Sequence, residues 1–138
     1  MPYRRRVEEN DQLHAAILII ADDEEVRDGI QGLLESDRYC ALAARNMADG
    51  IQLAARMPPD LILMSLGQSA DSMTTCARQI RQRAGLSETI PVVIFSIPAI
   101  PEGAEMEVGK AIYATRPDNF DQLRALLARL LGSVALGQ

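Results

Sequence analysis

The chain has 138 residues, of which 48% are hydrophobic, and it carries a net charge of −5 at pH 7. This length and composition suit one domain with an ordinary buried core. The negative charge and the scattered basic residues argue against nucleic acid as a partner of this domain. The longest apolar run, 15–21, is too short to cross a bilayer. We therefore expect a cytoplasmic domain that binds neither nucleic acid nor membrane.

A flexible polar leader is predicted over residues 1–13, and the first strand follows it at Ala15–Ala21. A continuous apolar run rich in β-branched residues is typical of a strand buried on both faces of a parallel sheet. Asp22 and Asp23 end this run. The apolar residues after them recur at helical spacing and predict a helix: Val26, Ile30, Leu33 and Leu34.

The middle of the chain repeats this alternation of strand and helix. A second strand at Tyr39–Ala44 precedes a helix that Asn46 can cap and that Pro58-Pro59 ends. A third strand at Leu61–Met64 precedes another helix. The apolar side of that helix holds Met73, Cys76, Ala77, Ile80 and Ala84.

The last part of the chain predicts two more strands, at Pro91–Phe95 and Ala111–Ala114. The residues between them predict a helix that is short or irregular, because they include Pro98, Pro101, Gly103 and Gly109. Asp118 can cap a final helix. Its predicted inward residues are Phe120, Leu123, Leu127, Leu130 and Leu131. We expect the domain to occupy residues 14–132 and residues 133–138 to form a frayed tail.

Five strands alternating with five helices indicate right-handed crossovers and a parallel sheet with helices on both faces. In such α/β sheets, ligands bind outside the carboxyl ends of the strands. The polar residues at those ends are Asp22, Asp23, Ser65, Ser96, Thr115 and Arg116. An acid pair can also simply begin a helix, where carboxylates favour the positive end of the helix dipole. Both interpretations of the acid pair stay open on the residues alone.

Four segments resemble, in order and spacing, the receiver domains of response regulators in two-component signalling. They are Ile17–Asp23, Pro59–Met64, Ile90–Ser96 and Gly109–Pro117, and the resemblance covers residues 15–131. It implies a flavodoxin-like (βα)5 fold, a doubly wound parallel sheet with strand order 2-1-3-4-5. In such domains an aspartate accepts a phosphoryl group from a phosphohistidine, with Mg²⁺ held largely by carboxylates.

The resemblance also assigns roles to individual positions. Asp22 and Asp23 match the acid pair of the family, Ser96 matches the switch hydroxyl, and Tyr113 matches the switch aromatic. The phosphoaccepting aspartate falls on Ser65. A serine hydroxyl is not ionised near neutral pH and needs a base to act as a nucleophile. The chain is therefore expected to be a pseudo-receiver without catalytic residues, and not an enzyme.

The lysine that contacts the phosphoryl group in the family falls on Arg116, which is still followed by Pro117. With Ser65 in place of a carboxylate, Asp22 and Asp23 are at most a vestigial metal site. No cofactor is required, and Mg²⁺ binding is expected to be weak. Arg116 can form a bidentate pair with Asp22 or Asp23, which would lock the pocket in one conformation.

Three functions remain open. The first is a phosphorylation-independent module that binds a protein partner, either a histidine kinase or an effector domain, or that forms a homodimer through the fourth helix, fifth strand and fifth helix. The second is an active receiver with atypical phosphorylation at Ser65 or Asp71. The third is a flavodoxin-like ligand-binding domain, against which no glycine-rich loop follows the first strand.

Overall fold

The computed structural model describes residues 15–95, 100–117 and 119–136. The elements, in chain order, are β1 (Ala16–Ala21), α2 (Glu24–Ser36), β2 (Cys40–Ala44), α3 (Met47–Arg56), β3 (Leu61–Ser65), α4 (Ala70–Arg83), β4 (Val92–Phe95), β5 (Glu105–Gly109), β6 (Ile112–Thr115) and α5 (Phe120–Leu136). These strands form one sheet in the order β2-β1-β3-β4-β6-β5. All pairs are parallel except β5 with β6.

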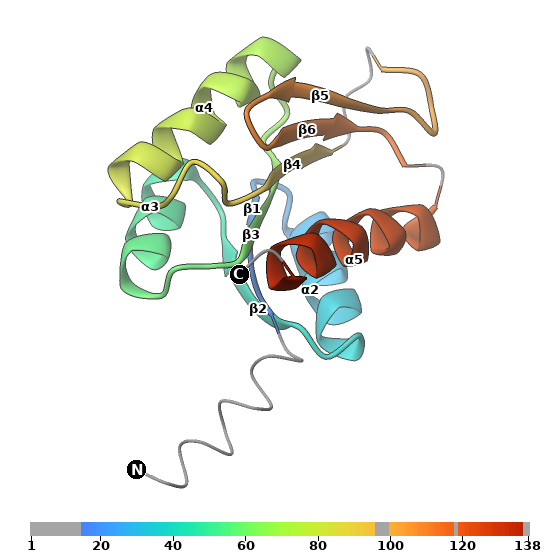
Figure 1. Ribbon diagram of the computed structural model, residues 1–138, viewed down its shortest axis with the longest axis horizontal. Helices are drawn as coiled ribbons and strands as arrows, with labels where there is room; N and C mark the ends of the chain where they lie inside the picture. Colours follow the sequence, from blue (N-terminus) through green and yellow to red (C-terminus); the bar gives the residue numbers. More distant parts are fainter. Residues whose placement is uncertain (1–14, 96–99, 118, 137–138) are drawn as a thin grey trace, which may run out of the picture.

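The sheet lies between two layers of helices, with α3 and α4 on one face and α2 and α5 on the other (Figure 1). Alternate residues of the central strands therefore enter two separate cores. Leu18 and Ile20 of β1 pack towards α3 and α4, whereas Ile17 and Ile19 pack towards α2 and α5. Because both faces are covered, β1 reads in the sequence as an unbroken apolar run rather than as an alternating one.

The predicted fold class, a flavodoxin-like doubly wound α/β sheet, is confirmed, with β6 in the place of the predicted fifth strand. One element differs from the prediction. The stretch between β4 and β6 was expected to contain a short or irregular helix, but its described residues form the antiparallel edge strand β5. The described part of the chain therefore holds the strand order 2-1-3-4-5 with one additional strand at its edge.

The local sequence explains why this stretch becomes a strand. Gly103 adopts a positive φ of 86°, and the Ala104 amide donates to the Pro101 carbonyl at 3.0 Å, which together form a turn. The four residues after Ala104 alternate between acidic and apolar, from Glu105 to Val108. This alternation has the two-residue period of a strand. The prolines and glycines nearby led instead to the prediction of a short or irregular helix.

The helix ends follow capping chemistry. The side chains of Asp23, Asn46 and Ser69 accept hydrogen bonds from backbone amides of α2, α3 and α4, which confirms the cap predicted at Asn46. At the start of α5, Asn119 accepts from the Gln122 amide at 2.9 Å. Asp118, the predicted cap, lies outside the described residues.

The two ends of the chain lie partly outside the described residues. Helix α5 runs to Leu136, past the expected end of the domain at residue 132. Residues 1–14 and 137–138 lie outside the described residues, so the polar leader and the last residues of the tail stay predictions. None of the helices in the described ranges is long and apolar enough to span a membrane.

A glycine pair on two helices tests this packing. A methyl group on Gly32 of α2 would meet no atom within 4 Å, so Gly32→Ala is expected to raise the free energy of unfolding by about 0.5–1 kcal/mol through helix propensity. A methyl group on Gly50 of α3 would lie 2.6 Å from Cδ1 of the fully buried Ile20, so Gly50→Ala is expected to destabilise the domain instead. Urea denaturation of both variants measures the difference, and equal changes at the two positions would contradict it.

Candidate functional site

The pairing of β1 with β3 brings two of the predicted site residues together. Ala21 and Ser65 are register partners at the carboxyl ends of these strands, and the Asp22 amide donates to the Ser65 carbonyl at 3.4 Å. Gly67 follows with a positive φ of 66°, and a methyl group there would lie 3.7 Å from Oδ2 of Asp22. The loop after β3 therefore passes close to the Asp22 carboxylate, which is exposed at this edge of the sheet.

Asp23 has a structural role at the same edge. Its Oδ1 accepts from the Val26 amide at 3.1 Å and so caps α2. Nearby, Arg27 donates through Nη1 to the Ala21 carbonyl at 2.9 Å, which holds the end of β1 and brings a positive charge close to the acid pair. Arg27 was not among the predicted site residues, because its only signal in the sequence is a basic residue one turn after two acids.

Ser65 is the last residue of β3 and is half-buried. After it, the buried amide of Leu66 donates to Sδ of Met73 at 3.4 Å, which fixes the loop against α4. Asp71, the alternative phosphoacceptor, lies in the exposed first turn of α4 rather than at the strand end.

The remaining predicted site residues lie on β4 and β6 or directly after them. Tyr113 is half-buried in the middle of β6, opposite Val93 of β4 and Glu107 of β5. Arg116 and Pro117 follow the carboxyl end of β6. Ser96 comes directly after β4 in the sequence but lies outside the described residues.

The predicted bridge between Arg116 and the acid pair is not formed. Arg116 donates through Nη1 to the Ile100 carbonyl at 3.3 Å, and no ion pair joins it to Asp22 or Asp23, all of which the structure describes. Its backbone is tied to the same loop, since its amide donates to the Ala104 carbonyl and its carbonyl accepts from the Gly103 amide. The 100–104 loop thus holds Arg116 by both backbone and side chain.

The donor set at this edge suits Mg²⁺ poorly. No group of three or more His, Cys, Asp or Glu side chains that could hold a metal ion occurs among the described residues. Mg²⁺ prefers octahedral oxygen ligands, with one or two carboxylates and several waters. Here one of the two acids already caps a helix, and Ser65 offers a neutral hydroxyl.

A cavity of about 680 Å³ lies beside the site, between α2 and α5. Its lining residues are Glu25, Val26, Gly29, Ile30, Phe95, Arg116, Pro117, Asn119, Phe120 and Leu123. Val26 is 37% exposed and Phe120 is 56% exposed. The expectation that Phe120 points inward is therefore wrong: helical periodicity predicts which face is apolar but not where two neighbouring helices leave a gap.

Solved structures with a similar fold include receiver domains. The receiver domain of a signal transduction histidine kinase from Syntrophus aciditrophicus is 22% identical, with a TM-score of 0.68 over 87% of this chain and 92% of that chain. The receiver domain of sensor histidine kinase PA1611 from Pseudomonas aeruginosa, which has magnesium in its active site cleft, is also 22% identical, with a TM-score of 0.65 over 87% and 99% of the two chains. These likenesses show the fold.

Two curated proteins are similar in sequence. The KDP operon transcriptional regulatory protein KdpE of Escherichia coli is 26% identical over 113 residues, which are 80% of this chain and 48% of that protein. The transcriptional regulatory protein YxdJ of Bacillus subtilis is 25% identical over 128 residues, 88% of this chain and 54% of that protein. The chain thus spans about half the length of these relatives. No family model matches it.

The chain has the doubly wound α/β fold of these receiver domains, with polar residues at the carboxyl ends of its strands. The chain is thus similar in fold to receiver domains and in sequence to response regulators, which agrees with the resemblance found in the sequence.

The cap made by Asp23 gives a testable prediction. Asp23→Ala removes the hydrogen bond to the Val26 amide and is expected to lower the free energy of unfolding by about 1 kcal/mol. Asp23→Ser keeps a capping oxygen and should retain most of the stability, and Asp22→Asn is the matched control because Asp22 does not cap the helix. Urea denaturation compares the three variants, and a loss at Asp22 equal to that at Asp23 would contradict this division of roles.

Proposed function

We propose that this receiver domain acts by contact with a protein partner and does not form an acyl phosphate. The observation that carries the proposal is the position of Ser65, at the carboxyl end of β3 and in register with the end of β1. The acceptor aspartate of the family falls on this position. A hydroxyl there can neither form an acyl phosphate nor supply the carboxylate that would help to hold Mg²⁺.

The surroundings of Ser65 support this proposal. A serine nucleophile needs a general base, and ordinary carboxylates are too weakly basic for that role. The single histidine of the sequence, His14, comes before the amino end of β1, whereas Ser65 ends β3. Under the proposal the domain is not an enzyme, needs no cofactor and binds Mg²⁺ weakly.

The contacts of Arg116 also favour a module that does not respond to phosphate. Its guanidinium donates to the Ile100 carbonyl, and its backbone is bonded on both sides to the 100–104 loop. A phosphoryl group at Ser65 would have to draw the side chain away from this loop. The partner is proposed to be a cytoplasmic histidine kinase or an effector domain, with a homodimer as the other arrangement. The exposed apolar rim of the cavity, Val26 and Phe120, supports a function by contact.

A titration with Mg²⁺ and beryllofluoride, followed by amide NMR, tests the proposal. Beryllofluoride mimics a phosphoryl group on an aspartate, and Ser65 offers it no carboxylate. The expected result is no saturable change at Asp22, Asp23 or the residues around Ser65. A saturable response there would show that the pocket still reads a phosphate-like signal, and the proposal would be abandoned.

The matched variant is Ser65→Asp, which restores a third carboxylate beside the acid pair. We expect this variant to bind Mg²⁺ at least about tenfold more tightly than the wild type, because an added unit charge close to a divalent ion contributes about 1.4 kcal/mol or more. Mg²⁺ titrations followed by amide NMR compare the two proteins. Equal affinities would mean that the serine is not what weakens the site.

An active receiver with atypical phosphorylation is the second candidate, and the exposure of Asp71 in the first turn of α4 favours it. Incubation with a small phosphodonor, followed by intact mass, separates the two. We expect no added phosphoryl group. A base-labile adduct lost in Asp71→Asn would establish Asp71 as the acceptor, and a base-stable adduct lost in Ser65→Ala would establish Ser65. The third candidate, a flavodoxin-like ligand-binding domain, is favoured by the 680 Å³ cavity, and a ligand copurified in it would support that candidate.

A further inference from the structure

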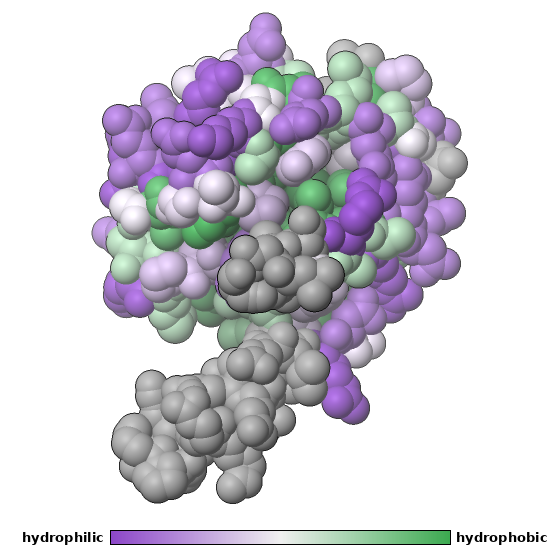
Figure 2. Space-filling view, viewed as in Figure 1, coloured by the Kyte–Doolittle hydropathy of each residue, from purple (hydrophilic) through white to green (hydrophobic). Residues whose placement is uncertain are grey.

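A basic pocket lies at the opposite end of the sheet from the acid pair. It is formed by the second half of α4, the loop from α4 to β4, and the turn between β5 and β6, and it encloses about 540 Å³. Its lining residues are Arg78, Arg81, Gln82, Leu86, Glu88 and Lys110. Hydrophilic side chains cover the surface over α4 in the view of Figure 2. The three cations outnumber the single carboxylate, which leaves an excess of two positive charges.

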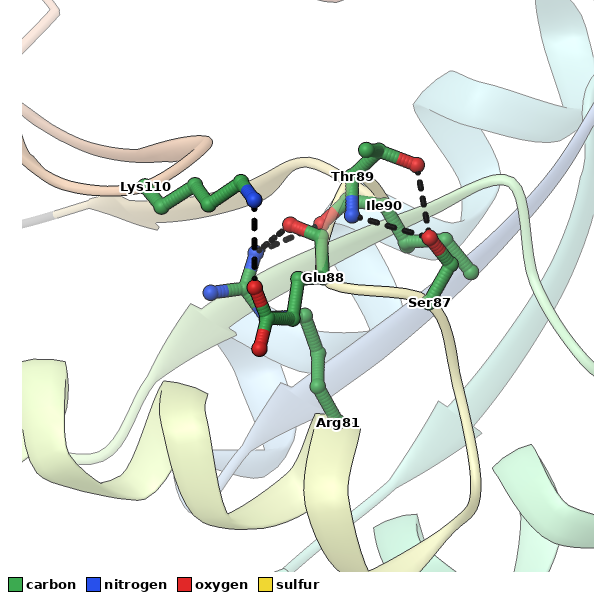
Figure 3. Close-up of polar contacts among 6 residues, drawn as sticks. All are labelled: Arg81, Ser87, Glu88, Thr89, Ile90 and Lys110. Atoms are coloured by element: carbon green, nitrogen blue, oxygen red, sulfur yellow. Dashed lines mark hydrogen bonds and ion pairs between the residues drawn. The ribbon is translucent and has the colours of Figure 1, made fainter.

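Arg81 is the buried member of this pocket. It is only 5% exposed, and its Nη1 donates to the Glu88 carbonyl at 2.9 Å and to the Ile90 carbonyl at 3.1 Å. Figure 3 shows the Arg81 side chain extending from α4 to this loop, with Glu88 and Lys110 facing it. Burial lowers the pKa of Arg81 and the charge of Arg78 lowers it further, whereas Glu88 raises it. A guanidinium nevertheless stays charged at neutral pH.

The hydrogen bonds to the two carbonyls do not use all the nitrogen donors of the Arg81 guanidinium. Nε of Arg81 is buried and has no hydrogen-bond partner in the described part of the chain. Buried polar groups in native proteins rarely lack a partner, and each exception calls for one, such as an ion or a water. The bonds to the loop carbonyls therefore account for Nη1 and leave Nε without a partner.

Arg78 and Lys110 bring two more cations to the pocket. Within the described ranges Arg78 makes no ion pair or hydrogen bond. Its Nη2 lies 3.6 Å from the position that a methyl group on Gly109 would occupy, and Gly109 directly precedes Lys110. Lys110 pairs with Glu88 at 3.1 Å, but both side chains are mostly exposed, at 67% and 74%. An exposed pair of this kind contributes little and can open for a stronger anion.

We propose that this basic pocket binds the phosphate group of a small molecule. A phosphate dianion matches the two excess positive charges, and its oxygens accept from the forked donors of arginine. The cavity is larger than a phosphate ion, so an organic group attached to the phosphate can also enter it. The bound phosphate would join α4 to the β5–β6 turn, on the side of the domain away from Ser65.

Titration with inorganic phosphate, at ionic strength held constant with chloride, is the first experiment. Proton–nitrogen NMR is used to follow the Arg81 Nε–H and the amides of Glu88, Thr89 and Lys110. We expect these signals to shift saturably while those of Asp22 and Ser65 do not. Shifts that grow linearly, or that acetate reproduces at equal concentration, would mean screening only and would overturn the proposal.

Three single variants sharpen the test, because their expected effects differ in sign. Arg78→Gln removes an unpaired cation and should weaken phosphate binding about threefold or more, whereas Glu88→Gln removes a competing carboxylate and should strengthen it by a similar factor. Arg83→Gln is the matched control, since Arg83 is exposed on the same helix but does not line the pocket. Equal weakening by Arg78→Gln and Arg83→Gln, or no gain from Glu88→Gln, would overturn the assignment to this pocket.

Glycerol phosphate in place of inorganic phosphate distinguishes the two sources of the same group. Binding at least severalfold tighter than that of inorganic phosphate assigns the pocket to a phosphorylated small molecule. Equal or weaker binding means that the free ion is what it selects, and the proposal of a small-molecule ligand is then wrong. Arg81 is left unchanged in all variants because its bonds to the Glu88 and Ile90 carbonyls hold the loop.

Discussion

The register between β1 and β3 is the constraint on which the candidate site depends. At the amino end, Asp60 fixes it twice, since its Oδ2 accepts from the Ala16 amide at 2.8 Å and its own amide donates to the Ala16 carbonyl at 2.7 Å. At the carboxyl end the same register places Ala21 opposite Ser65. Because β1 is apolar on both faces, its hydrophobic pattern alone specifies this register only weakly. The short hydrogen bonds of Asp60 supply the missing specificity.

The sheet separates charge along the strand direction. The acid pair lies where β1 ends and α2 begins, and carboxylates are favourable there because of the positive end of the helix dipole. Arg81 and Arg83 lie in the last turn of α4, where cations are favourable because of the negative end of the helix dipole. The helix dipole explains why basic residues occur at that end of α4. It does not explain the burial of Arg81, its unpartnered Nε, or the approach of Lys110 from a separate hairpin.

Much of the fold could be predicted because its signals are local. The unbroken run before Asp22, the cap at Asn46 and the strand that ends at Ser65 each follow from neighbouring residues. The features that could not be predicted depend on contacts distant in sequence. Arg116 has the length and charge to reach the acid pair, but the 100–104 loop holds it, and no pattern around Arg116 indicates that contact. Strand β5 was not predicted because the prolines and glycines around it outweighed its alternation of acidic and apolar residues.

Strand β5 forms part of the surface where the sequence predicted a helix. An edge strand has unpaired backbone groups, and acidic side chains on it discourage pairing with other chains. Glu105 and Glu107 are both exposed on β5, and Glu105 pairs with Arg129 of α5 at 2.8 Å. The side chain of Thr115 on β6 also donates to the Ala104 carbonyl at 3.0 Å. The loop, β5, β6 and α5 are thus joined by several hydrogen bonds, and the loop also holds Arg116. A switch at this surface would have to break these bonds together, and under the proposed function the surface keeps one arrangement.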